Sequence, residues 1–92
     1  MRNFENDLIT LFEDKIKTDD EFCKRLYGSI TNIDWKHKDG TCFGCTFRVA
    51  AAIVSDIRED GSYVDWYLDG VYGQLDDEIK EGLKSLGWEK KE

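Results

Sequence analysis

Hydrophobic side chains recur every three or four residues in four stretches of the chain, which is the spacing of one face of an α-helix. These stretches are residues 4–17, 18–28, 47–59 and 76–87. We expect Thr18 to cap the second helix in a capping box with Glu21, and Asp76 to cap the last helix. The pattern therefore predicts four helices, the last of which ends near Gly87.

Alternating residues and Asp-Gly pairs predict short antiparallel strands between these helices. The expected strand segments are residues 32–38, 41–45, 62–68 and 71–73. The first two flank Asp39-Gly40 and the last two flank Asp69-Gly70. The resulting order, ααββαββα, predicts an α+β fold that forms one domain over residues 1–92.

Length and hydropathy limit the class of protein. The chain has 92 residues, of which 40% are hydrophobic and 36% charged. It has no apolar run of the roughly 18 residues that a membrane-spanning helix needs. Its polar first residues do not resemble the hydrophobic core of a signal peptide. We therefore expect a cytoplasmic protein that does not act at a membrane.

The net charge of −7 is concentrated in one part of the chain, because residues 56–81 contain nine acidic and two basic residues. Such a field disfavours direct binding of nucleic acid and favours a basic protein partner. The expected partner-binding residues are Asp65, Asp69, Asp76, Asp77, Glu78 and Glu81, with smaller contributions from acids of the first helix. Ordinary helix capping and solubility are the alternative explanation for these acids.

Three cysteines and the single histidine lie within residues 23–45, at Cys23, His37, Cys42 and Cys45. Three thiolates and one imidazole are a common ligand set for structural zinc. If Asp39 and Gly40 are the two turn residues, His37 lies opposite Cys42, at a separation that suits two ligands of one ion. We therefore expect a zinc-stapled hairpin with a structural zinc cofactor.

Other roles remain open for the same thiols. Cys42 and Cys45 have the spacing of a redox pair, and Cys23 is equally suited to the core of a helix. The chain has no nucleophile elbow, Gly-rich phosphate loop or HExxH motif. We therefore expect a protein that is not an enzyme.

Two blocks of the sequence resemble those of a known group of proteins. The blocks are Phe47-Arg48-x-Ala50-Ala51-x-Ile53-Val54-x-x-Ile57-Arg58 and Gly61-x-Tyr63-x-Asp65-Trp66-Tyr67-x-x-Gly70, followed by Asp77-Glu78-Ile79 and Leu86-Gly87-Trp88. This pattern resembles small proteins encoded by bacteriophages and prophages, and the chain looks like a zinc-containing type II anti-CRISPR protein. The resemblance covers roughly residues 20–88.

The resemblance implies an inhibitor that acts in the cytoplasm of a bacterial host cell and binds the RNA-guided DNA nuclease of a type II CRISPR system. Such an inhibitor blocks DNA binding or cleavage, and it carries no catalytic residue. A nuclease of this kind holds DNA and guide RNA in basic channels, which an acidic protein can occupy. The alternative is a small zinc-binding adaptor of the phage or host whose partner is not a nuclease.

Overall fold

The computed structural model describes residues 2–59 and 75–91. In these ranges the chain forms α1 (Phe4–Thr18), α2 (Asp20–Ile30), β1 (Ile33–His37), β2 (Cys42–Cys45), α3 (Phe47–Arg58), α5 (Asp77–Ser85) and β3 (Trp88–Lys90). This mixture of helices and antiparallel strands confirms the α+β class. The predicted strands at 62–68 and 71–73 lie outside the described residues, so the full element order stays a prediction.

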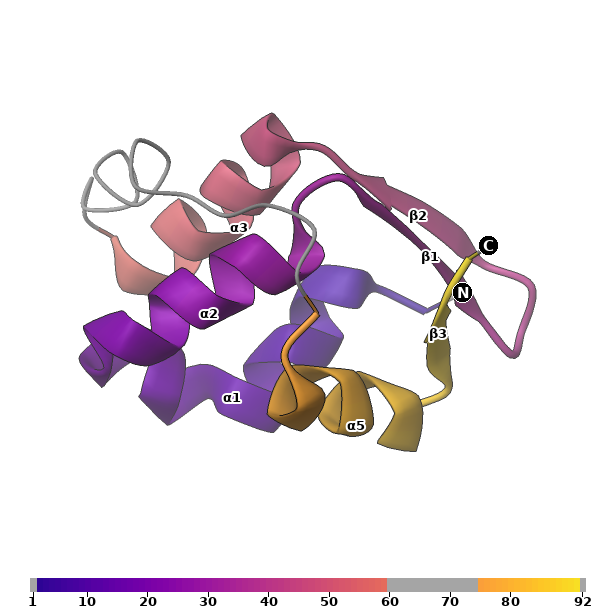
Figure 1. Cartoon of the computed structure of the whole chain (residues 1–92), viewed down its shortest axis with the longest axis horizontal. Coiled ribbons are helices and arrows are strands. Elements are labelled where there is room, and N and C mark those ends of the chain that lie inside the picture. Colours follow the sequence, from indigo (N-terminus) through magenta and orange to yellow (C-terminus); the bar gives the residue numbers. More distant parts are fainter. Residues whose placement is uncertain (1, 60–74, 92) are drawn as a thin grey trace.

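The strands form a three-stranded antiparallel sheet in the order β2-β1-β3. The sheet lies at one end of the molecule, at the upper right of Figure 1. The sequence pattern did not predict β3. Gly87 reverses the chain after α5 with a φ of 95°, and the next residue, Trp88, then pairs with His37.

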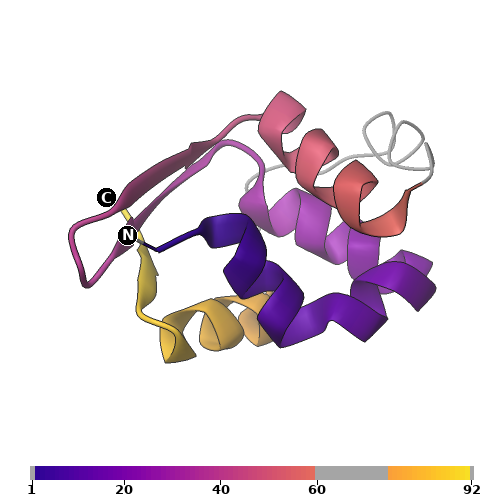
Figure 2. The same cartoon turned by 180° about the vertical axis from the view of Figure 1, so that it is seen from behind.

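The three helices α1, α2 and α3 pack against one another, and α5 connects α1 to β3. Figure 2 shows α1 beside α3 from the opposite side. Phe4 joins the helices to the sheet, because its ring lies 4.6 Å from that of Phe43, 5.1 Å from Trp88 and 5.6 Å from Trp35, measured between centroids. No helix in the described part of the chain combines the length and apolar character required to cross a membrane.

Two helix boundaries differ from those predicted. Asp19, not Thr18, caps α2, because its side chain accepts the amide of Phe22, while Thr18 ends α1. The helix also continues through Gly28, which is buried, to Ile30. Asp76 caps α5 as predicted, by accepting the amides of Glu78 and Ile79.

The register of the β1–β2 hairpin is shifted by one residue from the predicted one. Cys42 pairs with Lys36, and the amide of His37 donates to the carbonyl of Thr41. The predicted opposition of His37 and Cys42 is therefore wrong. A shift of one residue places a strand side chain on the opposite face of the sheet. The cause is a turn longer than the two residues that Asp39-Gly40 alone would form.

Candidate functional site

The structure places each predicted zinc ligand in a separate environment. The Cys23 thiol is buried, donates to the Ile16 carbonyl at 2.9 Å and accepts from Arg58 Nη1 at 3.3 Å. His37 Nε2 donates to the Leu86 carbonyl at 2.6 Å, and His37 Nδ1 accepts the Asp39 amide at 3.0 Å. Both ring nitrogens are thus occupied, which leaves neither lone pair for a metal.

The other two ligands lie on opposite faces of β2. Cys45 is buried on the core face, whereas Cys42 is exposed on the outer face. Among residues 2–59 and 75–91, no group of three or more His, Cys, Asp or Glu side chains is close enough to hold one ion. In this arrangement the four residues do not fit a tetrahedral zinc site.

Burial also controls the chemistry of the thiols. Desolvation raises the pKa of Cys45 to about 12. Desolvation likewise raises the pKa of Cys23, and the nearby Arg58 opposes this shift only in part. Both groups therefore remain neutral thiols at physiological pH, which disfavours the thiolate that redox exchange requires.

The predicted acidic surface is partly neutralised within the fold. Asp76 lies 3.2 Å from Arg25 Nη1, and Glu78 lies 2.6 Å from Lys15 Nζ. These contacts connect α5 to α1 and α2, and Lys15 and Arg25 lower the pKa of Glu78. The two acids thus have partners inside the molecule, which reduces the charge available to an external one.

The remaining predicted contact residues divide into two groups. Asp65 and Asp69 lie outside the described residues. Asp77 and Glu81 are exposed on α5, a helix that also carries the exposed bases Lys80 and Lys84. The exposed face of α5 therefore carries both signs of charge.

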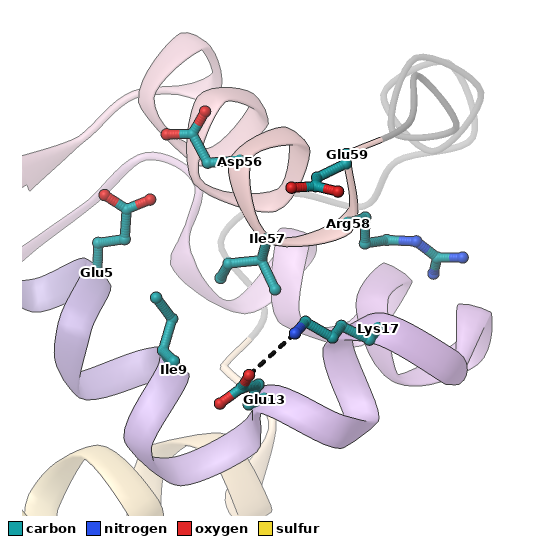
Figure 3. Close-up of a pocket in the computed structure, with 8 residues that line it drawn as sticks. All are labelled: Glu5, Ile9, Glu13, Lys17, Asp56, Ile57, Arg58 and Glu59. Carbon is teal, nitrogen blue, oxygen red and sulfur yellow. Dashed lines mark hydrogen bonds and ion pairs between the residues drawn. The ribbon is translucent and has the colours of Figure 1, made fainter.

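A different acidic feature lies between α1 and α3. A cavity of about 470 Å³ opens there, and Figure 3 shows its lining. We call it the acidic groove, and its lining residues are Glu5, Ile9, Glu13, Lys17, Asp56, Ile57, Arg58 and Glu59. Its two bases are engaged: Lys17 lies 2.9 Å from Glu13, and Arg58 lies 2.8 Å from Asp20 on α2.

Two carboxyl groups face each other across the acidic groove. Figure 3 shows Glu5 on α1 and Asp56 on α3 pointing into the same space. The pKa of Glu5 is raised, first by partial burial and then by the charge and hydrogen bonding of Asp56. In the described part of the chain neither carboxylate forms an ion pair. Residues 60–74, which follow α3, contain no Lys, Arg or His.

The acidic groove continues into a more apolar cleft of about 530 Å³. Glu5 and Asp56 line both spaces, and the cleft adds the apolar residues Phe43, Val49 and Ile53 together with two bases, Arg2 and Arg48. A carboxyl pair beside apolar surface suits a ligand that has a cationic end and an aliphatic stem, such as a lysine or arginine side chain.

Sequence reasoning missed this groove because Glu5 and Asp56 lie on separate helices. A single sequence does not reveal which helix faces meet. The available signal was local: each acid sits next to the hydrophobic stripe of its helix, where a side chain is only partly exposed. In comparisons with known proteins, no family model, no curated protein and no solved structure matches this chain.

Proposed function

We propose that this chain is a non-enzymatic inhibitor that binds a basic, nucleic-acid-handling protein in the bacterial cytoplasm. The partner is the RNA-guided DNA nuclease of a type II CRISPR system. The sequence resemblance and the net charge of −7 support this assignment. An acidic protein steered to a basic channel competes with the phosphate backbone that the channel normally holds.

The observation that carries the proposal is the carboxyl pair of the acidic groove. Glu5 and Asp56 face each other and form no ion pair in the described part of the chain, and the raised pKa of Glu5 reports an unfavourable negative charge. A partner Lys or Arg inserted between them would replace this repulsion with two charge-assisted hydrogen bonds. The apolar cleft beside them would accept the aliphatic part of the same side chain.

This proposal moves the principal contact away from the surface suggested by the sequence. Asp76 and Glu78 already pair with Arg25 and Lys15, so a partner would have to compete for them. Asp77 and Glu81 remain available on α5 as a secondary contact. The two surfaces can be tested separately because they involve different helices.

The test compares two double variants that change charge equally. Glu5→Gln with Asp56→Asn removes the carboxyl pair, and Asp77→Asn with Glu81→Gln removes the same charge from α5. Both are assayed for inhibition of DNA binding and DNA cleavage by the nuclease across a salt series. We expect the first variant to lose about tenfold or more in inhibition, and to lose most of the salt dependence.

Circular dichroism and thermal unfolding provide the control for folding of both variants. An equal loss of inhibition in both double variants would show that only the net charge of the protein matters for binding, and not the position of the carboxyl pair. A larger loss in the α5 variant would restore the surface suggested by the sequence. If the unmodified protein does not inhibit the nuclease at low salt, the proposed function is wrong.

The structural zinc ion remains a separate prediction. In the described arrangement, a four-ligand site would require the hairpin to shift by one residue and one ring nitrogen of His37 to exchange its hydrogen bond for the metal. Elemental analysis of untagged protein, combined with the His37 ring resonances, tests this directly. One zinc per chain with shifted His37 resonances supports the site. A zinc-free protein that retains the Leu86 contact excludes it.

A further inference from the structure

The edge of the sheet beside the apolar cleft carries backbone groups that the sheet does not use. β2 is an outer strand of the sheet, in the order β2-β1-β3. The amide of His37 donates to the carbonyl of Thr41, so the neighbouring pair, Lys36 and Cys42, is one whose members do not hydrogen-bond each other. The N–H and C=O groups of Cys42 and, two residues further on, of Gly44 therefore point away from β1.

This edge is open in the described part of the chain. Cys42 and Gly44 are both exposed, and no strand within residues 2–59 and 75–91 pairs with β2 on the side away from β1. Each residue thus presents one donor and one acceptor to the outside. A row of such groups is the template on which another chain can add a strand.

The apolar cleft lies directly beside this edge. Thr41, Cys42 and Phe43 line it from the hairpin, and Val49 and Ile53 line it from α3. Side chains of a strand alternate between the two faces of a sheet. A strand added to β2 would therefore direct every second side chain into the cleft and the others to the outer face of the sheet.

Charge distinguishes the two edges of the sheet. The β3 edge lies beside a cavity lined by Lys80, Lys84 and Lys90. The cleft beside β2 instead includes Glu5 and Asp56, which form no ion pair in the described ranges. A segment that carries a Lys or Arg is therefore attracted to the β2 edge and repelled from the β3 edge.

The two bases of the cleft are compatible with such a segment. Arg2 is neutralised by Asp7, at 2.7 Å. Arg48 is exposed on α3, eight residues before Asp56, which corresponds to about 12 Å along the helix. Arg48 thus leaves the carboxyl pair to a cation of the partner and repels that cation from the other end of the cleft.

We propose that β2 accepts an extended segment of the basic partner as an additional antiparallel strand. On the face that meets the cleft, this segment carries an aliphatic side chain and a Lys or Arg that reaches Glu5 and Asp56. The inference rests on the proposed function, from which it takes the basic partner, and it adds the manner of recognition. Backbone hydrogen bonds to Cys42 and Gly44 give affinity, and the alternate side chains give specificity.

The test uses the complete protein and the peptide Thr-Val-Thr-Lys-Thr-Val-Thr, blocked at both ends, in which Val and Lys share one face. Directly opposed residues of antiparallel strands share a face. Cys42 lies on the outer face, so the peptide groups that meet β2 belong to Thr. N-methylation of the two Thr residues that flank Lys should weaken binding at least tenfold. N-methylation of the two Val residues instead should leave binding unchanged, because their N–H groups face away from β2.

The acidic component is tested with a second peptide, in which Glu replaces the central Lys. We expect this peptide to bind at least tenfold more weakly to the parent protein. The double variant Glu5→Gln with Asp56→Asn should bind both peptides equally. Binding is measured by NMR titration, and hydrogen exchange of the Cys42 and Gly44 amides should slow when the Lys peptide is bound.

Two proline variants locate the strand on the protein. Cys42→Pro removes a donor that points away from β1 and should abolish peptide binding. Lys90→Pro is the matched control: the amide of Lys91 donates to Asp34, so the Lys90 amide points away from β1 at the other edge. This variant should bind the peptide like the parent. The methylated peptides are compared on the unchanged protein, so that comparison does not depend on how the variants fold.

The outcomes separate this inference from the proposed function. No binding of the Lys peptide, equal binding of the two methylated peptides, or binding without slower exchange at Cys42 and Gly44 would each overturn the inference. Full nuclease inhibition by folded Cys42→Pro would also overturn it, and would leave the proposed function intact. Peptide binding by a protein that does not inhibit the nuclease would instead support the strand addition and contradict the proposed function.

Discussion

The acidic groove and a cavity of about 220 Å³ between α5 and β3 are opposite in charge but alike in construction. Lys80, Lys84 and Lys90 line this second space, which we call the lysine cavity. Each lies between helices or strands that come from distant parts of the chain. Each carries groups of one sign whose partners are absent from the described structure: Glu5 and Asp56 in the groove, and Lys80, Lys84 and Lys90 in the cavity. By contrast, charges at the α5 N-terminus pair internally with Lys15 and Arg25.

The two regions differ in how deeply their polar groups are buried. The groove has partly exposed carboxyl groups, whose repulsion water can screen. The cavity is lined by Trp35, whose indole N–H is a fully buried donor that water in bulk cannot satisfy. We therefore expect the groove to act through association rate and salt dependence, whereas the buried donor beside the cavity affects the stability of the fold.

Trp88 lies between the two regions: it lines the lysine cavity and also the apolar cleft that extends the groove. Asp7 fixes its position by accepting its N–H at 2.7 Å and by pairing with Arg2 at the same distance. Substituting Asp7 therefore provides the most severe perturbation of both regions.

We predict that Asp7→Ala lowers the free energy of unfolding by about 2–3 kcal/mol, since it leaves a second buried indole without an acceptor. Urea denaturation measures the effect. Asp7→Asn keeps an oxygen that can accept the Trp88 N–H and should cost less. A loss of under 0.5 kcal/mol in Asp7→Ala, taken as about the size of a neutral surface change, would show that Trp88 is held by packing alone.

The turn that leads into β3 gives the second prediction. Gly87 has a φ of 95°, and a Cβ there would lie 2.6 Å from His37 Nε2. Gly87→Ala should therefore cost more than the roughly 1–2 kcal/mol of a left-handed residue. Gly40→Ala is the matched control, because Gly40 has the same φ with no atom within 4 Å of its Cβ. Equal losses would mean that the His37 ring moves aside freely.

The helices could be predicted from the sequence because their signals are local. Apolar spacing located α1, α3 and α5, and Asp76 was identified correctly as a cap. Where two local signals competed, the sequence was insufficient: Thr18 and Asp19 are both good caps, and packing of α2 selects Asp19. β3 was missed because three residues carry no periodic pattern, and its pairing with β1 depends on the distant turn at Gly87.

The candidate sites were harder to predict for a similar reason. The grouping of Cys23, His37, Cys42 and Cys45 rested on a hairpin register, and one residue of shift places Cys42 on the outer face. The groove and the cavity both depend on which helix faces meet. Net charge gives the sign of the whole chain, but it does not reveal the surface on which unpaired charge remains.

The third prediction concerns the pH dependence of stability, and its effect is smaller. The folded pKa of Glu5 is raised above its ordinary value of 4.5. The folded state therefore binds the proton more tightly than the unfolded state, and this contribution is fully present below that value. It is lost as pH rises through the folded pKa.

Stability should thus decrease over the interval above pH 4.5 in the parent protein, relative to Glu5→Gln. The substitution should increase stability at neutral pH by up to about 0.5 kcal/mol, as expected for a partly exposed group. Thermal unfolding across a pH series measures both quantities. A Glu5→Gln profile parallel to that of the parent would show that the carboxyl pair does not interact.

The last prediction uses Cys42 to separate the two regions without changing the core. Cys42 is exposed and lines the apolar cleft, whereas Cys23 and Cys45 are buried. A maleimide should therefore modify Cys42 first in the folded protein, with stability changed by less than about 0.5 kcal/mol. A bulky adduct should weaken nuclease inhibition by obstructing the cleft, yet leave the NMR resonance of the Trp35 indole N–H in place. Cys42→Ser, treated in the same way, is the control.

Slow modification of Cys42 that becomes fast when a chelator is added would instead indicate a thiolate bound to zinc, because coordination protects a cysteine from alkylation. Weaker inhibition together with a shifted Trp35 indole resonance on labelling would mean that the groove and the cavity are coupled through Trp88.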